Sequence, residues 1–207
     1  MEDKLSRYFK QFYILIFFVV FLAYALLPVL APVLMHHGHE LPAKLIYWIY
    51  QFLCHQLPYR SFFLYGEQPY YPLPEAEMGD SVKTFPEMVD TSEMDFADMR
   101  EFIGNEQMGY KFAVCQRDFA LFLAIALFCL IFFLANSRIP KINLWIWLLF
   151  GVAPIAIDGF SQLFSGTFSS IWVVRESTPL LRVLTGGVFG FFTAWFLIPY
   201  LNEKIKS

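Results

Sequence analysis

The chain has 207 residues, of which 57% are hydrophobic and 20% aromatic. Soluble domains usually hold about 45–50% apolar residues, so this composition excludes an ordinary water-soluble fold. The 15 basic and 18 acidic side chains give a net charge of −3 and form no basic stripe of the kind that binds nucleic acid. The sequence therefore predicts one membrane domain over residues 1–207, with the lipid bilayer as its partner and no nucleic-acid partner.

Four apolar segments are long enough to cross a bilayer, whose hydrocarbon core of about 30 Å needs about 20 helical residues. The first, residues 11–35, contains no charged side chain. Its length favours a retained spanning helix over a cleaved signal peptide, whose apolar region is only about 7–15 residues long. The other three are residues 117–135, 144–164 and 180–201. We therefore expect an all-α, polytopic helical bundle with four transmembrane helices.

Two segments between the first and second spans are less apolar. Residues 41–65 carry polar side chains in their second half, and we interpret them as a re-entrant or interfacial helix that breaks near Pro58. Residues 66–110 hold most of the acidic side chains and show no sustained helical or strand period. They are predicted to form an extramembrane acidic loop inserted within the membrane domain, with a short helix near residues 92–102.

The basic residues predict the orientation of the chain, because those in short loops tend to stay in the cytoplasm. Basic clusters at residues 4–10, 138–141 and 204–206 share one side of the membrane only if an even number of crossings separates them. Four spans satisfy this condition. The protein is therefore predicted to be a multi-pass protein of the cell membrane with a cytoplasmic N-terminus and a cytoplasmic C-terminus, and its acidic loop lies outside.

Most polar side chains within or beside the apolar segments fall at this predicted outer end. Ionisable groups in a membrane are costly unless they are paired or hydrated, so a convergent set of them indicates a site. The inner ends of the spans hold no comparable set. The sequence thus predicts an outward-facing ligand pocket that consists of His55, Gln56, Arg117, Asp158, Gln162, Arg175, Glu176 and Arg182.

The cysteines allow two interpretations. Cys54 and His55 precede the proline break, and Cys115 begins the next span. Thiolate and imidazole groups bind zinc or copper, so these three residues form a candidate metal site, to which Asp158 could add an oxygen ligand. The alternative is a disulfide between Cys54 and Cys115 that closes the acidic loop on an oxidising face. Unpaired thiols are the third case, and Cys129, in the middle of a span, is expected to pack in the core.

The role of Asp158 also stays open at this stage. It lies one helical turn before Gln162, so the two share a helix face. Asp158 could act as a general acid or base, or it could form an ion pair with Arg175 or Arg182 that ties two helices together. Arg175 precedes the last span, where an arginine can bind a phosphate, a carboxylate or a lipid headgroup. The sequence identifies no catalytic residue and no reaction.

Four polar motifs follow one another along the chain. They are Cys54-His55-Gln56 followed by Pro58, Arg60 and Ser61, then Cys115-x-Arg117-Asp118, then Asp158-Gly159-x-x-Gln162, and Arg175-Glu176-Ser177-Thr178 followed by Arg182 and Thr185-Gly186. In this order they resemble the DUF2085 family of uncharacterised prokaryotic predicted membrane proteins, over residues 46–190. The resemblance implies a polytopic membrane protein with these motifs and no particular activity. The acidic insertion at residues 66–110 is longer than the linker expected in that family.

These observations lead to two hypotheses about function. The first is a multi-pass membrane protein whose outward-facing pocket of Cys, His, Asp and Arg side chains binds a metal ion or a small polar ligand. The alternative is an accessory subunit or assembly factor of a larger membrane complex, with Cys54 and Cys115 in a structural disulfide. A transporter is disfavoured, because transporters place polar residues near the midplane of several spans and the inner halves here are apolar.

Overall fold

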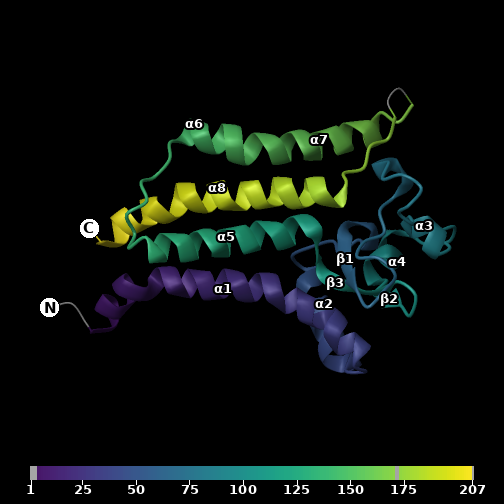
Figure 1. Cartoon of the computed structure of the whole chain (residues 1–207), viewed down its shortest axis with the longest axis horizontal. Coiled ribbons are helices and arrows are strands. Elements are labelled where there is room, and N and C mark those ends of the chain that lie inside the picture. Colours follow the sequence, from purple (N-terminus) through teal and green to yellow (C-terminus); the bar gives the residue numbers. More distant parts are fainter. Residues whose placement is uncertain (1–3, 171–172, 207) are drawn as a thin grey trace.

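The computed structural model describes the backbone of residues 4–170 and 173–206 and the side chains of 12–170 and 173–205. Long helices lie side by side, and a small folded unit covers one end of them (Figure 1). After the predicted topology we name this the extramembrane unit, its end of the bundle the outer end, and the opposite end the inner end. Across the bundle the order is α1 (Lys4–His36), α5 (Gln116–Leu134), α8 (Pro179–Lys206) and α7 (Ala153–Thr167). This order leaves α7 at one edge of the bundle.

Among the described residues, four helical stretches are long and apolar enough to span a membrane. They are Phe12–His36, Gln116–Leu134, Leu144–Thr167 and Pro179–Ile205. By length and composition they confirm the four predicted transmembrane segments. Successive spans run in opposite directions, so both ends of the chain lie at one end of the bundle (Figure 1). The third span consists of α6 (Leu144–Ile146), the π-helical turn η3 (Trp147–Val152) and α7.

The inner half of the bundle has an apolar core. Its buried residues come from α1, α5 and α8 and are Tyr13, Ile14, Phe128, Cys129, Phe132, Ala194 and Ile198. Cys129 is fully buried there, which confirms its predicted packing role.

Helices α5 and α8 approach each other closely at their outer ends. A Cβ atom at Gly186 would overlap the backbone of Arg117, and one at Gly190 would overlap the backbone of Leu121. Small residues at this four-residue spacing permit such an approach. The contact places the first turn of α8, which carries Arg182, beside the first turn of α5.

The predicted helix at residues 41–65 is shorter than expected. The structure forms α2 (Glu40–Gln51), which leaves the end of α1 at an angle (Figure 1). The second half of the segment is a loop, the 3-10 turn η1 (Pro58–Arg60) and the strand β1 (Ser61–Leu64). The helix therefore ends at Gln51, before the predicted break at Pro58. The residues after Pro58 are not helical because they pair with β3, a strand far along the chain.

The prediction of an all-α fold was incomplete. The extramembrane unit contains a three-stranded antiparallel sheet in the order β1, β3, β2. Strand β3 (Gly109–Cys115) lies in the centre, and β2 (Gly104–Asn105) pairs with its first residues. These strands were not predicted, because β2 is very short and β1 pairs with residues that are distant in the sequence.

The acidic segment between the strands also contains short helices. They are η2 (Pro74–Ala76), α3 (Phe85–Met88) and α4 (Phe96–Glu101). Helix α4 confirms the short helix expected near residues 92–102. Asp95 caps it by accepting hydrogen bonds from two backbone N–H groups of its first turn, at 2.7 and 2.9 Å. The segment is thus a folded unit rather than a plain loop.

Lys111 on β3 holds this unit against the end of α2. The side chain is fully buried, and its Nζ donates hydrogen bonds to the backbone carbonyls of Gln56 and, at 2.8 Å, Arg100. Burial lowers the pKa of Lys111 from its ordinary value of 10.5 to about 7. A neutral amine has two N–H groups, which match the two carbonyl acceptors.

This burial predicts that stability rises with pH. Between the folded pKa of about 7 and the unfolded value of 10.5, the unfolded chain binds more protons than the folded chain. Thermal unfolding midpoints in mild detergent should therefore be higher at about pH 9 than at about pH 6. In Lys111→Met, which cannot titrate, this rise should be much smaller. Equal rises in the two proteins would contradict the assignment.

Candidate functional site

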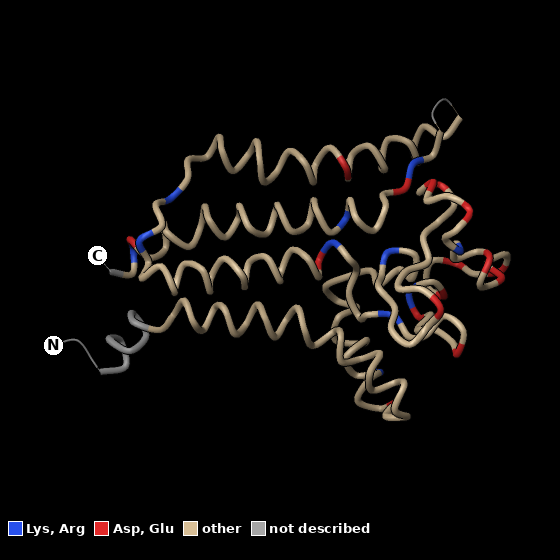
Figure 2. Tube along the Cα trace, in the orientation of Figure 1, with Lys and Arg blue, Asp and Glu red and all other residues tan. Residues whose placement is uncertain are grey.

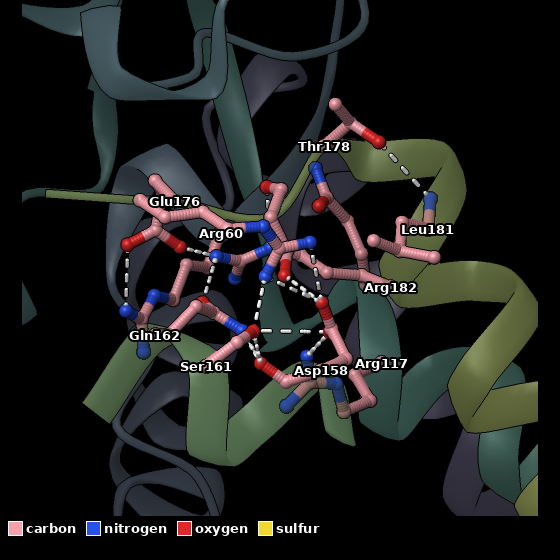
Figure 3. Close-up of polar contacts among 12 residues, drawn as sticks. Arg60, Arg117, Asp158, Ser161, Gln162, Glu176, Thr178, Leu181 and Arg182 are labelled. Carbon is pink, nitrogen blue, oxygen red and sulfur yellow. Dashed lines mark hydrogen bonds and ion pairs between the residues drawn. The ribbon is translucent and has the colours of Figure 1, made fainter. Parts of the chain in front are cut away.

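Charged side chains from separate segments meet at the outer end of the bundle, beside the extramembrane unit (Figures 2 and 3). We call this set the charge cluster. It consists of two carboxylates and four guanidinium groups, which belong to Asp158, Glu176, Arg60, Arg117, Arg175 and Arg182. They come from η1, α5, α7, the first turn of α8 and the connection that leads into α8.

Asp158 on α7 is the centre of the cluster. Its Oδ1 accepts hydrogen bonds from both terminal nitrogens of Arg175, each at 3.1 Å, and from the Ser177 hydroxyl. Its Oδ2 accepts from Arg117 on α5. A carboxylate this buried is tolerated only when it is paired and hydrogen-bonded. Asp158 thus links α7 to α5 and to the connection before α8.

Glu176 forms the second centre. It makes ion pairs with Arg60, at 2.8 Å, and with Arg182. Arg182 also donates to the Ser177 carbonyl at 3.1 Å and to the Gln162 side-chain oxygen at 3.3 Å. Figure 3 shows these contacts converging around Asp158 and Gln162. Glu176 therefore ties the extramembrane unit, through Arg60, to the first turn of the last span.

The cluster carries more positive than negative charge. Four arginines pair with two carboxylates, which leaves these six side chains with a formal charge of +2. In addition, the Nε atoms of Arg60 and Arg117 are buried and have no hydrogen-bond partner among the residues that the structure describes. Buried donors are normally paired. The cluster can therefore accept further anionic oxygen atoms.

A cavity of about 520 Å³ opens beside the charge cluster. Arg60, Arg117 and Arg175 form its polar side. On the other side lies α7, which contributes Gly159 and Gly166 among others. We call this space the arginine cavity.

A second cavity of about 200 Å³ adjoins the first, because Arg60 and Arg117 line both. Its other walls include Cys54, His55 and Cys115. We call it the cysteine cavity. The two cavities lie between the end of α2 and α7 and share Arg60 and Arg117 as lining residues.

The cysteine cavity holds a group of three possible metal ligands. The Sγ atoms of Cys54 and Cys115 and a carboxylate oxygen of Asp118 lie within 4.8 Å of one another. Cys115 caps α5, where its Sγ accepts from the Asp118 N–H at 3.5 Å, and its own N–H donates to Cys54 Sγ at 3.3 Å. The third possible ligand of this group is therefore Asp118, and not His55 or Asp158 as predicted.

The cysteines are free thiols in the structure, so the predicted disulfide is not supported. Instead the Cys115 thiol donates to Cys54, and this hydrogen bond lowers the pKa of Cys54. The same hydrogen bond, together with burial, raises the pKa of Cys115 well above its ordinary value. The pair is therefore arranged with Cys54 as the more acidic thiol.

The structure gathers six of the eight residues predicted for the ligand pocket around the charge cluster. These six are Arg117, Asp158, Gln162, Arg175, Glu176 and Arg182. The other two line the cysteine cavity. Gln56 is buried and donates to the Tyr47 carbonyl at 2.8 Å, whereas His55 is exposed with its ring against Phe96.

Three polar residues of the site were not among the predicted pocket residues: Arg60, Ser161 and Ser177. Arg60 could have been found from its place in the same motif as Cys54 and His55. Ser161 accepts a hydrogen bond from Arg175 at 2.6 Å, and it lies on the Asp158 helix within one turn of it. Ser177 stands in the motif Arg175-Glu176-Ser177-Thr178, but only the structure shows that its hydroxyl donates to Asp158.

The Asp158–Arg117 pair should contribute strongly to stability. Asp158→Asn is expected to lower the unfolding free energy by roughly 3 kcal/mol, because it removes the buried carboxylate that pairs with Arg117 and Arg175 and leaves these partly exposed guanidinium groups without a counter-charge. Combined with Arg117→Gln, the loss should be clearly smaller than the sum of the single losses in a double-mutant cycle. The exposed Lys141–Glu203 pair at the inner end is the matched control, with a coupling of at most about 1 kcal/mol. Additive losses at Asp158 and Arg117 would contradict this assignment.

Comparisons with known proteins agree with this architecture. The family model described as "Predicted membrane protein (DUF2085)" matches residues 105–196. The chain is also 26% identical, over 205 residues, to an uncharacterized protein of Methanocaldococcus jannaschii, in an alignment that covers 95% of this chain and 96% of the relative. No solved structure matches. Over residues 105–196, which carry most of the charge cluster, the chain is therefore confirmed to resemble the DUF2085 family of predicted membrane proteins, as its motifs predicted.

Proposed function

We propose that this protein binds a small anionic ligand, with a phosphate or carboxylate group, in the arginine cavity at the outer face of the membrane. The observation that carries the proposal is the excess of guanidinium groups over carboxylates in the charge cluster. The buried Nε atoms of Arg60 and Arg117, which lack acceptors among the described residues, support it.

The charges are arranged so that the cations face the ligand. The side chains of Arg60, Arg117 and Arg175 are 36%, 23% and 40% exposed, and all three line the cavity. Of the two carboxylates, Asp158 is 3% exposed and does not line the cavity, and Glu176 lines it but is only 9% exposed. Guanidinium groups held in place in this way match the oxygen atoms of a phosphate or carboxylate. The carboxylates therefore position the arginines and leave a positive surface toward the cavity.

We place the site on the extracytoplasmic side of the cell membrane. The basic connection between α5 and α6 and the end of α8 lie at the opposite end of the bundle, and most acidic residues lie in the extramembrane unit (Figure 2). Basic residues at short connections favour the cytoplasm. The exposed apolar face of helix α2, with Leu41 and Trp48, suits the lipid–water interface on that same side.

Inorganic phosphate is the first probe of this site. We expect purified protein in mild detergent to bind it by isothermal titration calorimetry, and Arg60→Gln to weaken the binding by about tenfold, since a hydrogen bond to a charged group contributes about 1.5–3 kcal/mol. Arg60 is the suitable position because Glu176 keeps its pair with Arg182 when Arg60 is changed. Arg138→Gln, an exposed arginine at the other end of the bundle, is the control and should bind as wild type does. If phosphate and acetate both fail to bind, or bind equally to Arg60→Gln, the proposal is wrong.

A second candidate function is metal binding in the cysteine cavity. The grouping of Cys54, Cys115 and Asp118 favours it, because two thiolates and a carboxylate suit zinc, and thiolates also suit copper. A water molecule, or His55 from the same cavity, would supply a fourth ligand. This site would lie beside the anion site, since Arg60 and Arg117 line both cavities.

Metal analysis tests this second candidate. Protein titrated with zinc and then desalted should retain about one ion per chain by mass spectrometry of its metal content. Cys54→Ser should lose it, whereas Cys129→Ser, which changes a cysteine of the apolar core, should keep it. Wild-type protein that retains neither zinc nor copper would exclude the metal site without affecting the anion site.

A further inference from the structure

We propose that the anion is the phosphate group of a membrane lipid, which reaches the arginine cavity from the outer leaflet along α7. This inference rests on the anion site proposed above and names the source of its ligand. A lipid phosphate and free phosphate present the same kind of oxygen atoms to the arginines. The walls of the cavity are therefore what favours one source over the other.

One wall of the cavity belongs to a helix that faces lipid. Helix α7 lies at the edge of the bundle, with α8 as its neighbour (Figure 1). Its large apolar side chains are mostly exposed, including Ile157, Phe160, Leu163 and Phe164. In a spanning helix such side chains contact hydrocarbon. The arginine cavity is therefore in contact with the lipid-facing surface of the protein at the end of this span.

The wall that α7 contributes has no bulky side chain at two positions. Gly159 and Gly166 are separated by two helical turns, so they share one face with Leu163 between them, and all three line the cavity. A Cβ atom at either glycine would meet no atom within 4 Å. The wall of the cavity on α7 is therefore low at these two positions, and Leu163 between them belongs both to this wall and to the exposed apolar surface of the helix.

The polar end of this path is held in position. Arg175 donates to Asp158 at 3.1 Å and to Ser161 at 2.6 Å, so its guanidinium group stays at the cavity with part of its surface exposed. Arg60 and Arg117 lie on the same wall and add two further guanidinium groups. Positive groups at one end and an apolar strip at the other match an amphiphile with a phosphate headgroup and hydrocarbon chains.

The test compares two probes on three proteins. Binding of inorganic phosphate and of phosphatidic acid is measured on delipidated protein in a phosphate-free detergent, for wild type, Phe160→Gln and Leu184→Gln. Phe160 belongs to the exposed apolar surface of α7 and does not line the arginine cavity, so a polar side chain there disturbs the path of the hydrocarbon chains and leaves the anion site in place. Leu184 on α8 is the matched control, because it is an exposed apolar side chain of another span and does not line the arginine cavity.

We expect wild type to bind phosphatidic acid more tightly than inorganic phosphate, and Phe160→Gln to weaken lipid binding by about tenfold while phosphate binding changes by less than about twofold. Leu184→Gln should change neither. Arg60→Gln should weaken both probes. Phosphate binding without lipid binding, or lipid binding that Phe160→Gln leaves unchanged, would overturn the lipid inference and leave the anion site intact. Absence of binding for both probes would overturn the inference and the anion site together.

Discussion

The outer end of this bundle depends on one buried carboxylate. Asp158 accepts hydrogen bonds from Arg117, Arg175 and Ser177, and these partners belong to α5 and to the connection before α8. Without a counter-charge, guanidinium groups at the membrane edge would favour positions in water rather than contact with one another. Asp158 therefore permits a concentration of positive charge where three helices meet, and the cavity beside it owes its chemistry to that concentration.

The extramembrane sheet completes the site from the other side. Strand β1 pairs with β3 so that Ser61 lies opposite Cys115, and the chain passes from β3 directly into α5. This register brings the segment with Cys54 and Arg60 against the first turn of α5, which carries Arg117 and Asp118. The charge cluster and the group of two thiols and a carboxylate thus share one cause, which is the pairing of these two strands.

Much of this architecture could be predicted because it depends on local properties. A spanning helix is visible in the sequence as an uninterrupted apolar run. The even number of crossings between the basic clusters then indicated which polar residues would meet at one end of the bundle. The sheet, the early end of α2 and the position of Arg60 depend on contacts between residues that are distant in sequence. A local period in the sequence does not reveal such contacts. For this reason the third possible metal ligand beside the two thiols was predicted to be His55, whereas in the structure it is Asp118.

The central claim is that the charge cluster and the extramembrane unit occupy one face of the membrane, opposite the tight turn between α5 and α6. Site-specific labelling tests it most directly, with single cysteines at Glu77, Val173 or Ser137 in a background where Cys54, Cys115 and Cys129 are serine. Glu77 and Val173 lie together beside Glu176, at a surface cavity of the outer end. We expect a membrane-impermeant maleimide to label these two positions on intact cells and Ser137 only after permeabilisation. Labelling of Glu77 and Val173 from opposite sides, or of Ser137 together with them, would contradict the account.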